Sequence, residues 1–269
     1  MMLSVVVATK NEELNIEACL RTVKWADEIV VIDMESTDRT RELAGKLGAR
    51  VYVSAGGLHK LIPYNKNLGI KKAKGEWVMI VDADERVSRQ LAEEIMRAIK
   101  SHSRYVAYKF PIPTYYWGKW IFHGWDLDQV RLFRKDSCSG YTGKMIHDVL
   151  GIRGSVGKLY GRLYHLGHLT FHDFIETMNC YTTTDTALWF QAGAKEVRFV
   201  DLFKNSLANF YYQYFRFKGY KDGIHGLTMC LLMAIYHFVE RAKLWELEYK
   251  KKNDELHKFD EEFYQNKLR

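Results

Sequence analysis

Cysteine is scarce in this sequence, and the spacing of its four cysteines argues against a zinc site and a disulfide framework. They lie far apart and never form a Cys-x-x-Cys pair, at Cys19, Cys138, Cys180 and Cys230. A reducing cytoplasm therefore fits best. The first residues, MMLSVVV, also lack the basic residues and the length of a signal peptide, and we expect them to begin a strand.

Two glycine-rich phosphate-binding motifs are also missing. The loop after the first predicted strand reads Thr9-Lys10-Asn11-Glu12, without the Gly-x-Gly-x-x-Gly of a dinucleotide-binding domain. Those glycines allow a pyrophosphate to reach the helix backbone, so a dinucleotide-type Rossmann domain is not expected. The sequence contains no Gly-Lys-Ser/Thr phosphate loop either. Any phosphate must therefore be bound by a metal ion and basic side chains.

The composition is that of a globular protein with a cationic surface. Hydrophobic residues make up 47% of the chain and charged residues 27%, and the formal net charge is +7 with a pI near 9.0. This charge favours an anionic partner, such as a phosphate ligand, a nucleic acid or an acidic membrane surface. Nucleic-acid binding is the weakest of these, because the basic residues are dispersed among acids and form no known motif.

The first hundred residues alternate between short apolar runs and amphipathic segments joined by short loops. This alternation predicts the α/β class, with a doubly wound, mostly parallel sheet. Ser36 or Thr37 is expected to cap the second helix, and Ser88 the fourth. The expected strands are Leu3–Ala8, Glu28–Asp33, Arg50–Val53 and Trp77–Val81, and the expected helices are Leu14–Val23, one after Thr37, Pro63–Ala73 and one after Ser88.

The fourth predicted strand ends in a group of acids. Asp82, Asp84 and Glu85 follow an apolar run that is too short for a helix and is typical of a fully buried strand. Ligands of parallel α/β sheets bind just beyond the carboxyl ends of the strands. Two carboxylates at that position suit a hard divalent cation and the phosphates that it neutralises. The simpler alternative is a polar loop followed by a helix cap.

After Arg104 the pattern changes to half-buried strands, around Val106–Phe110 and Gln129–Arg134. The aromatic segment Tyr115–Trp125 lies between them, and it suits the floor of a sugar site and a hydrophobic core about equally well. Arg131 and Arg134 are expected to face one side of their strand together. They would bind phosphate or acceptor, or form a structural ion pair.

Helices are expected to dominate after Thr170, so we divide the chain into a catalytic domain, 1–198, and an amphipathic helical region, 199–269. The segment Ile224–Val239 is strongly apolar but is interrupted by polar residues, and it is not expected to span a membrane. The stretch from residue 202 to residue 252 contains nine Lys and Arg residues but only four acids. A basic, aromatic helical pair of this kind indicates either a membrane-surface element or a helical cap on the core.

Three histidines near the start of the helical region have spacing i, i+3, i+7, at His165, His168 and His172. This spacing fits one face of a helix and superficially resembles a metal-binding run. Gly167 and the expected helix start near Thr170 argue against one continuous helix there.

Several motifs together resemble the inverting family-2 glycosyltransferases with the GT-A fold. They are Val5-Val6-Val7-Ala8-Thr9-Lys10-Asn11-Glu12-Glu13, Asp33 with Ser36-Thr37-Asp38, Lys66-Asn67-Leu68-Gly69, and Asp82-Ala83-Asp84. Further motifs are similar to those of the bacterial lipopolysaccharide-core β-glucosyltransferases: Gly124-Trp125, Arg131-Leu132-Phe133-Arg134 and Ile146-His147-Asp148. The resemblance covers about Met2 to His165, and its joint pattern is more specific than any single motif.

The resemblance implies a nucleotide-sugar donor, most often a UDP-sugar, and a lipid-linked or envelope-glycan acceptor. The residues assigned to the donor are Thr9, Asn11, Glu12, Asp33, Asn67, Asp82, Arg131 and Arg134. Of these, Thr9, Glu12 and Asp33 would surround the base, and Asp82 the ribose and base region. Read without the resemblance, Asp33 could cap a turn, and Glu12 could be an acid favoured by a helix dipole.

The resemblance also implies a metal site and a catalytic base. Asp84 would bind Mg²⁺ or Mn²⁺ that bridges the diphosphate. An inverting transfer needs a base that takes the proton of the acceptor hydroxyl, and Asp148 is the candidate, where related enzymes often carry Glu. His147 beside it would be a metal ligand, a diphosphate contact or an orienting partner.

These expectations describe a metal-dependent hexosyltransferase that is cytoplasmic and peripheral on the inner face of the plasma membrane. Its partners would be a nucleotide sugar, a glycan or lipid-linked acceptor and an anionic membrane surface. Two alternatives are a non-catalytic, membrane-associated nucleotide-sugar-binding protein and a nucleotidyltransferase. The second would normally need a glycine-rich basic loop after the first strand, which this chain lacks.

Overall fold

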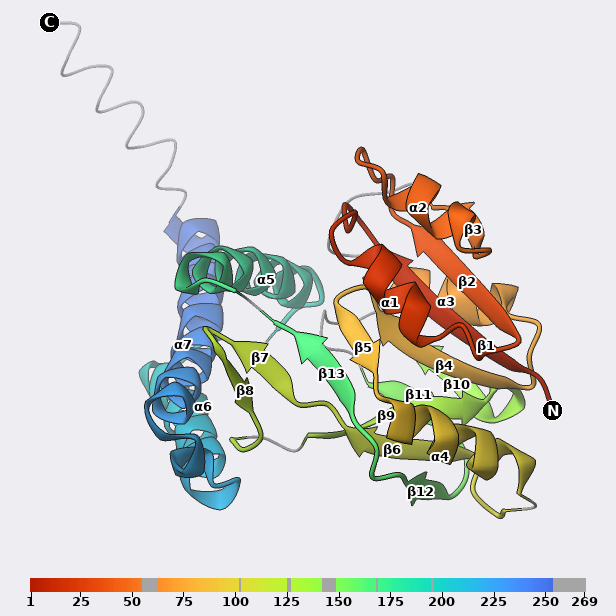
Figure 1. Cartoon of the computed structure of the whole chain (residues 1–269). Coiled ribbons are helices and arrows are strands. Elements are labelled where there is room, and N and C mark those ends of the chain that lie inside the picture. Colours follow the sequence, from red (N-terminus) through yellow and green to blue (C-terminus); the bar gives the residue numbers. More distant parts are fainter. Residues whose placement is uncertain are drawn as a thin grey trace, which may run out of the picture.

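The computed structural model describes residues 1–54, 62–101, 103–124, 127–141, 149–167, 169–194 and 196–253. Within them, a seven-stranded sheet has the order β12-β6-β9-β4-β1-β2-β3 (Figure 1). Strands β3, β2, β1 and β4 run parallel, whereas β9 is antiparallel to both of its neighbours. These strands are β1 (Leu3–Thr9), β2 (Glu28–Asp33), β3 (Arg50–Val53), β4 (Trp77–Asp82), β6 (Ala107–Pro111), β9 (Asp128–Arg134) and β12 (Val156–Lys158).

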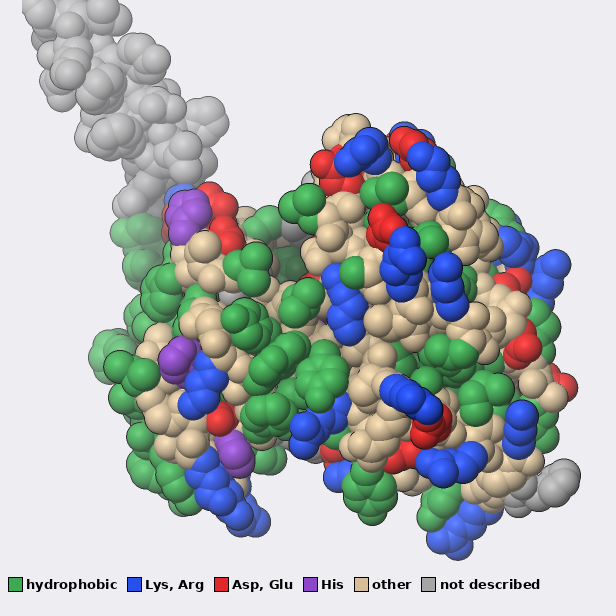
Figure 2. All heavy atoms as spheres, in the orientation of Figure 1, with side chains coloured by type: hydrophobic (Ala, Val, Ile, Leu, Met, Phe, Trp, Pro, Cys, Tyr) green, Lys and Arg blue, Asp and Glu red, His purple; other side chains and the backbone are tan. Residues whose placement is uncertain are grey.

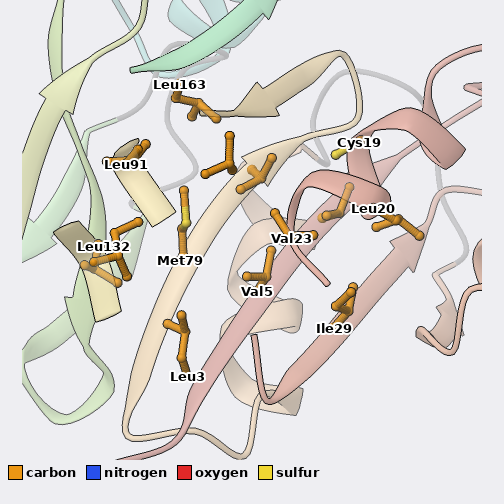
Figure 3. Close-up of a cluster of buried hydrophobic side chains, with 14 of the residues drawn as sticks. Leu3, Val5, Cys19, Leu20, Val23, Ile29, Met79, Leu91, Leu132 and Leu163 are labelled. Atoms are coloured by element: carbon orange, nitrogen blue, oxygen red, sulfur yellow. The ribbon is translucent and has the colours of Figure 1, made fainter. Parts of the chain in front are cut away.

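Helices cover both faces of this sheet, which confirms the predicted α/β class with a doubly wound, mostly parallel sheet. Val5 and Val7 of β1 join one buried cluster with α1 (Ile16–Thr22), α2 (Thr40–Lys46) and α4 (Arg89–Lys100) (Figure 3). Val6 points to the opposite face and packs with α3 (Ile62–Lys72). Because successive strand residues face opposite ways, a strand buried on both sides must be apolar throughout.

One of the two expected helix caps differs from the structure. Ser88 caps α4 as expected, since its side chain accepts a hydrogen bond from the Leu91 N–H. Neither Ser36 nor Thr37 caps α2, which begins at Thr40. The Asp38 carboxylate accepts from the backbone N–H and the hydroxyl of Thr40 instead. The cap prediction was wrong because the loop after β2 is longer than expected and Ser36 bonds to the loop after β1.

A second sheet, of order β5-β13-β7-β8, joins the catalytic part to the C-terminal helices. Its strands are β5 (Glu85–Val87), β7 (Thr114–Tyr116), β8 (Lys119–Ile121) and β13 (Leu163–Leu166). A short antiparallel pair, β10 (Cys138–Tyr141) and β11 (Leu150–Ile152), packs beneath the large sheet. Trp117 and Gly118, both with positive φ, make the tight turn between β7 and β8.

Three long helices form the C-terminal lobe on the left of Figure 1: α5 (Phe171–Gln191), α6 (Phe199–Tyr211) and α7 (Gly223–Asn253). Helices α5 and α7 share a buried cluster with Tyr116 and Ile121 of the small sheet. In the described part of the chain, one helix, Gly219–Lys251, is long and apolar enough to cross a membrane by length and composition. Met229, Leu232 and Tyr236 of α7 are nevertheless buried inside the protein.

Helix α3 lies very close to the sheet at Gly69. A Cβ atom added there would collide with Cγ1 of Val6 and would lie 3.3 Å from Cγ1 of Ile32. Only glycine permits this approach, which sets the distance between α3 and the strands that carry the acids. In contrast, Gly45 of α2 is exposed, and an added Cβ would meet nothing within 4 Å.

We therefore predict opposite effects for two Gly→Ala changes. Gly69→Ala should lower the free energy of unfolding by about 1–3 kcal/mol, because it overpacks a buried contact. Gly45→Ala, the matched control, should leave stability unchanged or raise it by up to about 1 kcal/mol, because alanine favours the helix. Urea unfolding followed by circular dichroism measures both. Equal stability of Gly69→Ala and the unaltered protein would contradict the close packing of α3.

Candidate active site

The acids at the end of β4 form a compact ion cluster that ties several elements together. Asp82 lies 2.7 Å from Lys66 Nζ of α3 and 3.1 Å from Arg131 Nη1 of β9. Arg131 Nη2 also lies 3.3 Å from the carboxylate of Glu85, which opens β5. The other oxygen of Glu85 accepts a hydrogen bond from the Asp82 N–H at 2.7 Å. Two cations thus sit against two carboxylates around one tight turn.

The protonation tendencies within the cluster follow from burial and from these contacts. Burial acts to raise the pKa of Asp82, but Lys66 and Arg131 hold it well below its usual range. Burial raises the pKa of Glu85 in spite of Arg131, because this carboxyl is almost fully enclosed. Burial would lower the pKa of Arg131, yet Glu85 and Asp82 raise it further above its ordinary value. Asp82 and Arg131 therefore remain charged.

Asp84 has a different environment from the cluster beside it. Its carboxylate lies 3.1 Å from Nε2 of His165 on β13, and each side chain is about one-third exposed, at 30% and 32%. Burial lowers the pKa of His165, but the carboxylate of Asp84 outweighs it and raises the pKa to about 9. The imidazole is therefore protonated near neutral pH, and a cation that bound this partly exposed pair would have to displace the proton on Nε2.

This pair of donors fits a divalent cation that a phosphate ligand helps to hold. Carboxylate oxygen and imidazole nitrogen are both ligands of first-row divalent ions, and Mg²⁺ sites use one or two carboxylates plus substrate phosphates. Among the described residues, no group of three or more His, Cys, Asp or Glu converges on one point. A cation bound by Asp84 and His165 would therefore need its remaining ligands from the substrate and water.

The loops that follow β1 and β2 are joined to each other by hydrogen bonds. The Asn11 N–H donates to Ser36 Oγ, and the Asn11 side chain accepts from the Thr37 N–H, both at 2.8 Å. The Glu12 N–H donates to Thr40 Oγ1 at 2.8 Å. The Asn11 side chain therefore shapes this edge of the sheet.

Two acceptor atoms at this edge are buried and unsatisfied. Thr9 Oγ1 and Asp33 Oδ2 accept no hydrogen bond from the described residues, although Asp33 is fully buried. The other oxygen of Asp33 accepts from the Ser36 N–H at 2.9 Å. An unpaired buried acceptor costs about 1–3 kcal/mol, so these two atoms are suited to a ligand that donates hydrogen bonds.

Glu12 belongs to the same electrostatic neighbourhood as the acids of β4. Burial raises the pKa of its carboxyl, and the negative charge of Asp84 raises it further, against a hydrogen bond from Asn15. The structure thus brings Thr9, Glu12 and Asp33 to one edge of the sheet with Asp82 and Asp84.

Asn67 and Arg134 lie outside the ion cluster around Asp82, and their roles in binding the nucleotide sugar stay predictions. Both ends of the Asn67 amide bond to the backbone of Tyr141, as donor at 2.9 Å and as acceptor at 2.8 Å, so Asn67 holds β10 against α3. The expectation that Arg131 and Arg134 face one side together was wrong, because residues three apart in a strand point to opposite faces. Arg134 pairs with Asp136, opposite the start of β4.

The expected base, Asp148, and its neighbour His147 lie outside the described residues, as do His168 and Trp125. Asp128, another acid in this region, contacts Lys158 at 2.5 Å and Lys109 at 3.7 Å and is mostly buried. His172 lies in α5, 77% exposed, beside Glu176. His165 and His172 therefore belong to different elements, as the argument from Gly167 predicted.

The aromatic segment between β6 and β9 divides into two roles. Tyr116 is buried with Phe174 and Met178 of α5, whereas Trp120 makes ring contacts with Tyr115 and Tyr164 at centroid distances of 5.3 and 4.9 Å. The first is core, and the second group is half-buried on the other face of the small sheet. The core reading is thus confirmed for Tyr116, and the sugar-site reading of Tyr115 and Trp120 stays a prediction.

The sequence reasoning missed three residues that complete this site. Lys66 contacts Asp82 and His165 contacts Asp84. Both residues lie in segments that the sequence analysis discussed, but neither was assigned to the site. Tyr181 of α5 is largely buried, and burial, together with Asp82 and Asp84, raises its pKa to about 12. Helix α5 therefore lies beside the carboxyl ends of the strands, as Figure 1 also shows. The strand that carries His165 reads LYHL, without a strict apolar–polar alternation, so the sequence held no clear signal for it.

Comparisons with known proteins find that this chain is similar to glycosyltransferases. An uncharacterized glycosyltransferase of Rickettsia typhi is 29% identical over 266 residues, covering 93% of this chain and 89% of the relative. The lipopolysaccharide core biosynthesis glycosyltransferase LpsC of Rhizobium meliloti is 25% identical over 258 residues, covering 91% and 92%. The mannosyltransferase PcManGT of Pyrobaculum calidifontis, solved with GDP-Man and Mn²⁺, has a TM-score of 0.54 at 14% identity, covering 90% and 86%.

The structural likeness identifies the fold as the GT-A fold of glycosyltransferases. The family model for glycosyl transferase family 2 matches residues 4–147. This match covers more than half of the chain, including β1, β2, β4 and the acids that follow them. The chain is therefore a glycosyltransferase that belongs to glycosyl transferase family 2.

Proposed function

We propose that this protein is a metal-dependent, inverting hexosyltransferase that uses a UDP-sugar and a lipid-linked or envelope-glycan acceptor. The proposal rests on two features that lie together at one edge of the sheet. One is the open pair of Asp84 and His165, 3.1 Å apart. The other is the pair of unsatisfied buried acceptors on Thr9 and Asp33. The first suits a diphosphate with its cation, and the second suits the hydrogen-bond donors of a nucleotide.

The residues at this edge of the sheet bind different parts of the nucleotide-sugar donor. Thr9, Glu12 and Asp33 receive the base, and Asp82 the ribose, with Arg131 behind it. Asp84 and His165 would hold Mg²⁺ or Mn²⁺, and the cation would supply positive charge against the leaving diphosphate. Lys66 and Arg131 offset Asp82 and Glu85, so these two acids would repel an anionic donor less than unpaired carboxylates would.

The second half of the reaction needs a base on the opposite side of the sugar. We assign this role to Asp148, which takes the proton of the acceptor hydroxyl while that oxygen bonds to the anomeric carbon and the diphosphate departs. Asn67 acts at a distance, because it fixes Tyr141, the residue from which the chain leads toward Asp148. We therefore describe Asn67 as a positioning residue.

The acceptor class is supported by a relative, LpsC, whose name places it in lipopolysaccharide core biosynthesis. A non-catalytic nucleotide-sugar-binding protein is the remaining alternative, since family membership argues against a nucleotidyltransferase. A screen of nucleotide sugars for release of nucleoside diphosphate, with and without Mn²⁺, tests the proposal. Release from a UDP-sugar in the presence of Mn²⁺ supports it. Binding of donors without release in the presence of envelope-glycan acceptors supports the alternative.

The metal role of Asp84 predicts a specific loss. Asp84→Asn should reduce transfer at least about 100-fold, because the cation loses its carboxylate ligand, while thermal stability stays close to that of the unaltered protein. Chelation by EDTA should abolish transfer by the unaltered enzyme. Asp136→Asn is the matched control, since Asp136 is 65% exposed and pairs only locally with Arg134. If EDTA-treated enzyme transfers at the untreated rate, the metal role is wrong.

If Asp148 is the base, its replacement should slow sugar transfer without weakening the binding of the nucleotide. Asp148→Asn preserves size but removes the proton acceptor, so transfer should fall by about 10²–10⁴-fold. Affinity for UDP by calorimetry should barely change. Asp128→Asn serves as a matched control, because Asp128 is already paired with Lys158, and transfer should survive that change. Full activity of Asp148→Asn would move the base elsewhere, and lost UDP binding would make Asp148 part of the donor site.

A further inference from the structure

The C-terminal lobe carries a continuous run of exposed apolar side chains that the proposed transfer reaction does not use. We call the segment 199–224 the α6 surface; it comprises α6, the turns Tyr212–Arg216 and Gly219–Asp222, and the first residues of α7. Ten large apolar residues in it are between 42% and 80% exposed. They are Phe199, Val200, Phe203, Leu207, Tyr211, Tyr212, Phe215, Phe217, Tyr220 and Ile224.

The periodicity of α6 explains why these residues share one side. Phe203, Leu207 and Tyr211 recur every four residues and therefore lie along one face of the helix. An adjacent side of the helix is turned inward, where the small residue Ser206 is buried against the protein. Phe203 also contacts the ring of Phe238 at a centroid distance of 5.5 Å, which fixes α6 on α7. Leu207 and Tyr211, 67% and 59% exposed, thus remain uncovered although the helix is packed.

The charges on the α6 surface are of one sign. Its exposed charged residues are all cationic: Lys204, Arg216, Lys218 and Lys221. Its two acids are both engaged, since Asp201 pairs with Arg198 at 3.0 Å, and Asp222 is buried and accepts from the backbone of Phe122 and His123. In Figure 2, hydrophobic side chains gather over the lobe formed by α5 to α7, and Lys and Arg side chains mark its lower end.

The exposed apolar side chains and the cations together indicate what kind of partner binds the α6 surface. A second copy of the same face would bring four cations against four cations, which opposes a symmetric dimer. Exposed Phe and Leu with Tyr and cationic side chains are typical of elements that lie in a membrane interface. Helix α7 packs through Met229, Leu232 and Tyr236 into the protein core, so the lobe suits docking on a bilayer rather than crossing it.

We propose that the α6 surface docks the protein on an anionic lipid bilayer, with the apolar side chains inserted at the headgroup boundary and the four cations on the lipid phosphates. The docking surface follows from the exposed residues alone and not from the proposed transfer. Its assignment to the cytoplasmic face of the plasma membrane rests on the proposed function. The surface also differs from the charged end of α7 around Lys250, since it is centred on α6.

Flotation with vesicles tests the proposal on the full chain without any sugar donor. The protein should float with vesicles of phosphatidylcholine containing phosphatidylglycerol, and much less with phosphatidylcholine alone. Reversing Lys204, Arg216, Lys218 and Lys221 to Glu should lower partitioning by about 100-fold or more, since each basic residue contributes several-fold near an anionic surface. Replacing Leu207 and Phe215 by Ser should lower it by about tenfold or more.

The matched control reverses four exposed cations of the catalytic part, Arg21, Lys46, Arg89 and Lys100, to Glu. It makes the same change in net charge, and flotation should persist. Loss of flotation in the control to the same extent would mean that net charge alone acts, which overturns the proposal. Absence of flotation, or a dimer by light scattering that the Leu207 and Phe215 changes abolish, also overturns it. A protein that floats but transfers no sugar keeps this inference and loses the proposed function.

Discussion

The ion cluster around Asp82 is the interaction on which the rest of this site depends. Strand β4 is apolar along its length and ends in three acids within four residues. Isolated carboxylates at a half-buried strand end would be costly, since a charge leaving water needs paired partners. Lys66 from α3 and Arg131 from β9 supply them. The cluster thereby ties together three elements that are far apart in the sequence.

The cluster also explains why neighbouring acids have different chemistry. Asp82 and Glu85 are engaged by cations and by the turn itself, so they support the site more than they offer themselves to a cation. Asp84, between them along the chain, points toward His165 instead and remains partly exposed. Asp84 lies in the turn between β4 and β5, and this turn directs it away from Asp82 and Glu85. One short segment thus provides both the ion-paired acids that support the site and the partly exposed carboxylate of Asp84.

The fold was largely predictable from the sequence, because short apolar runs and acid-ended strands are local signals. The contacts that complete the site were not. His165 lies 81 residues from Asp84 in the sequence, and only the pairing of β13 with β5 and β7 brings them together. The error with Arg134 had a different origin. Its spacing from Arg131 already placed the two residues on opposite faces, so counting along the strand would have excluded it.

Calorimetric titration of UDP into the unaltered protein and into Asp84→Asn, each with and without Mn²⁺, tests the central claim most directly. The claim is that nucleotide and cation bind together at the carboxyl ends of β1, β2 and β4. It predicts that Mn²⁺ raises the affinity of the unaltered protein for UDP by about tenfold or more, by reciprocal coupling, and that Asp84→Asn removes this gain. An affinity for UDP that is indifferent to Mn²⁺, or an equal gain in both proteins, would contradict it.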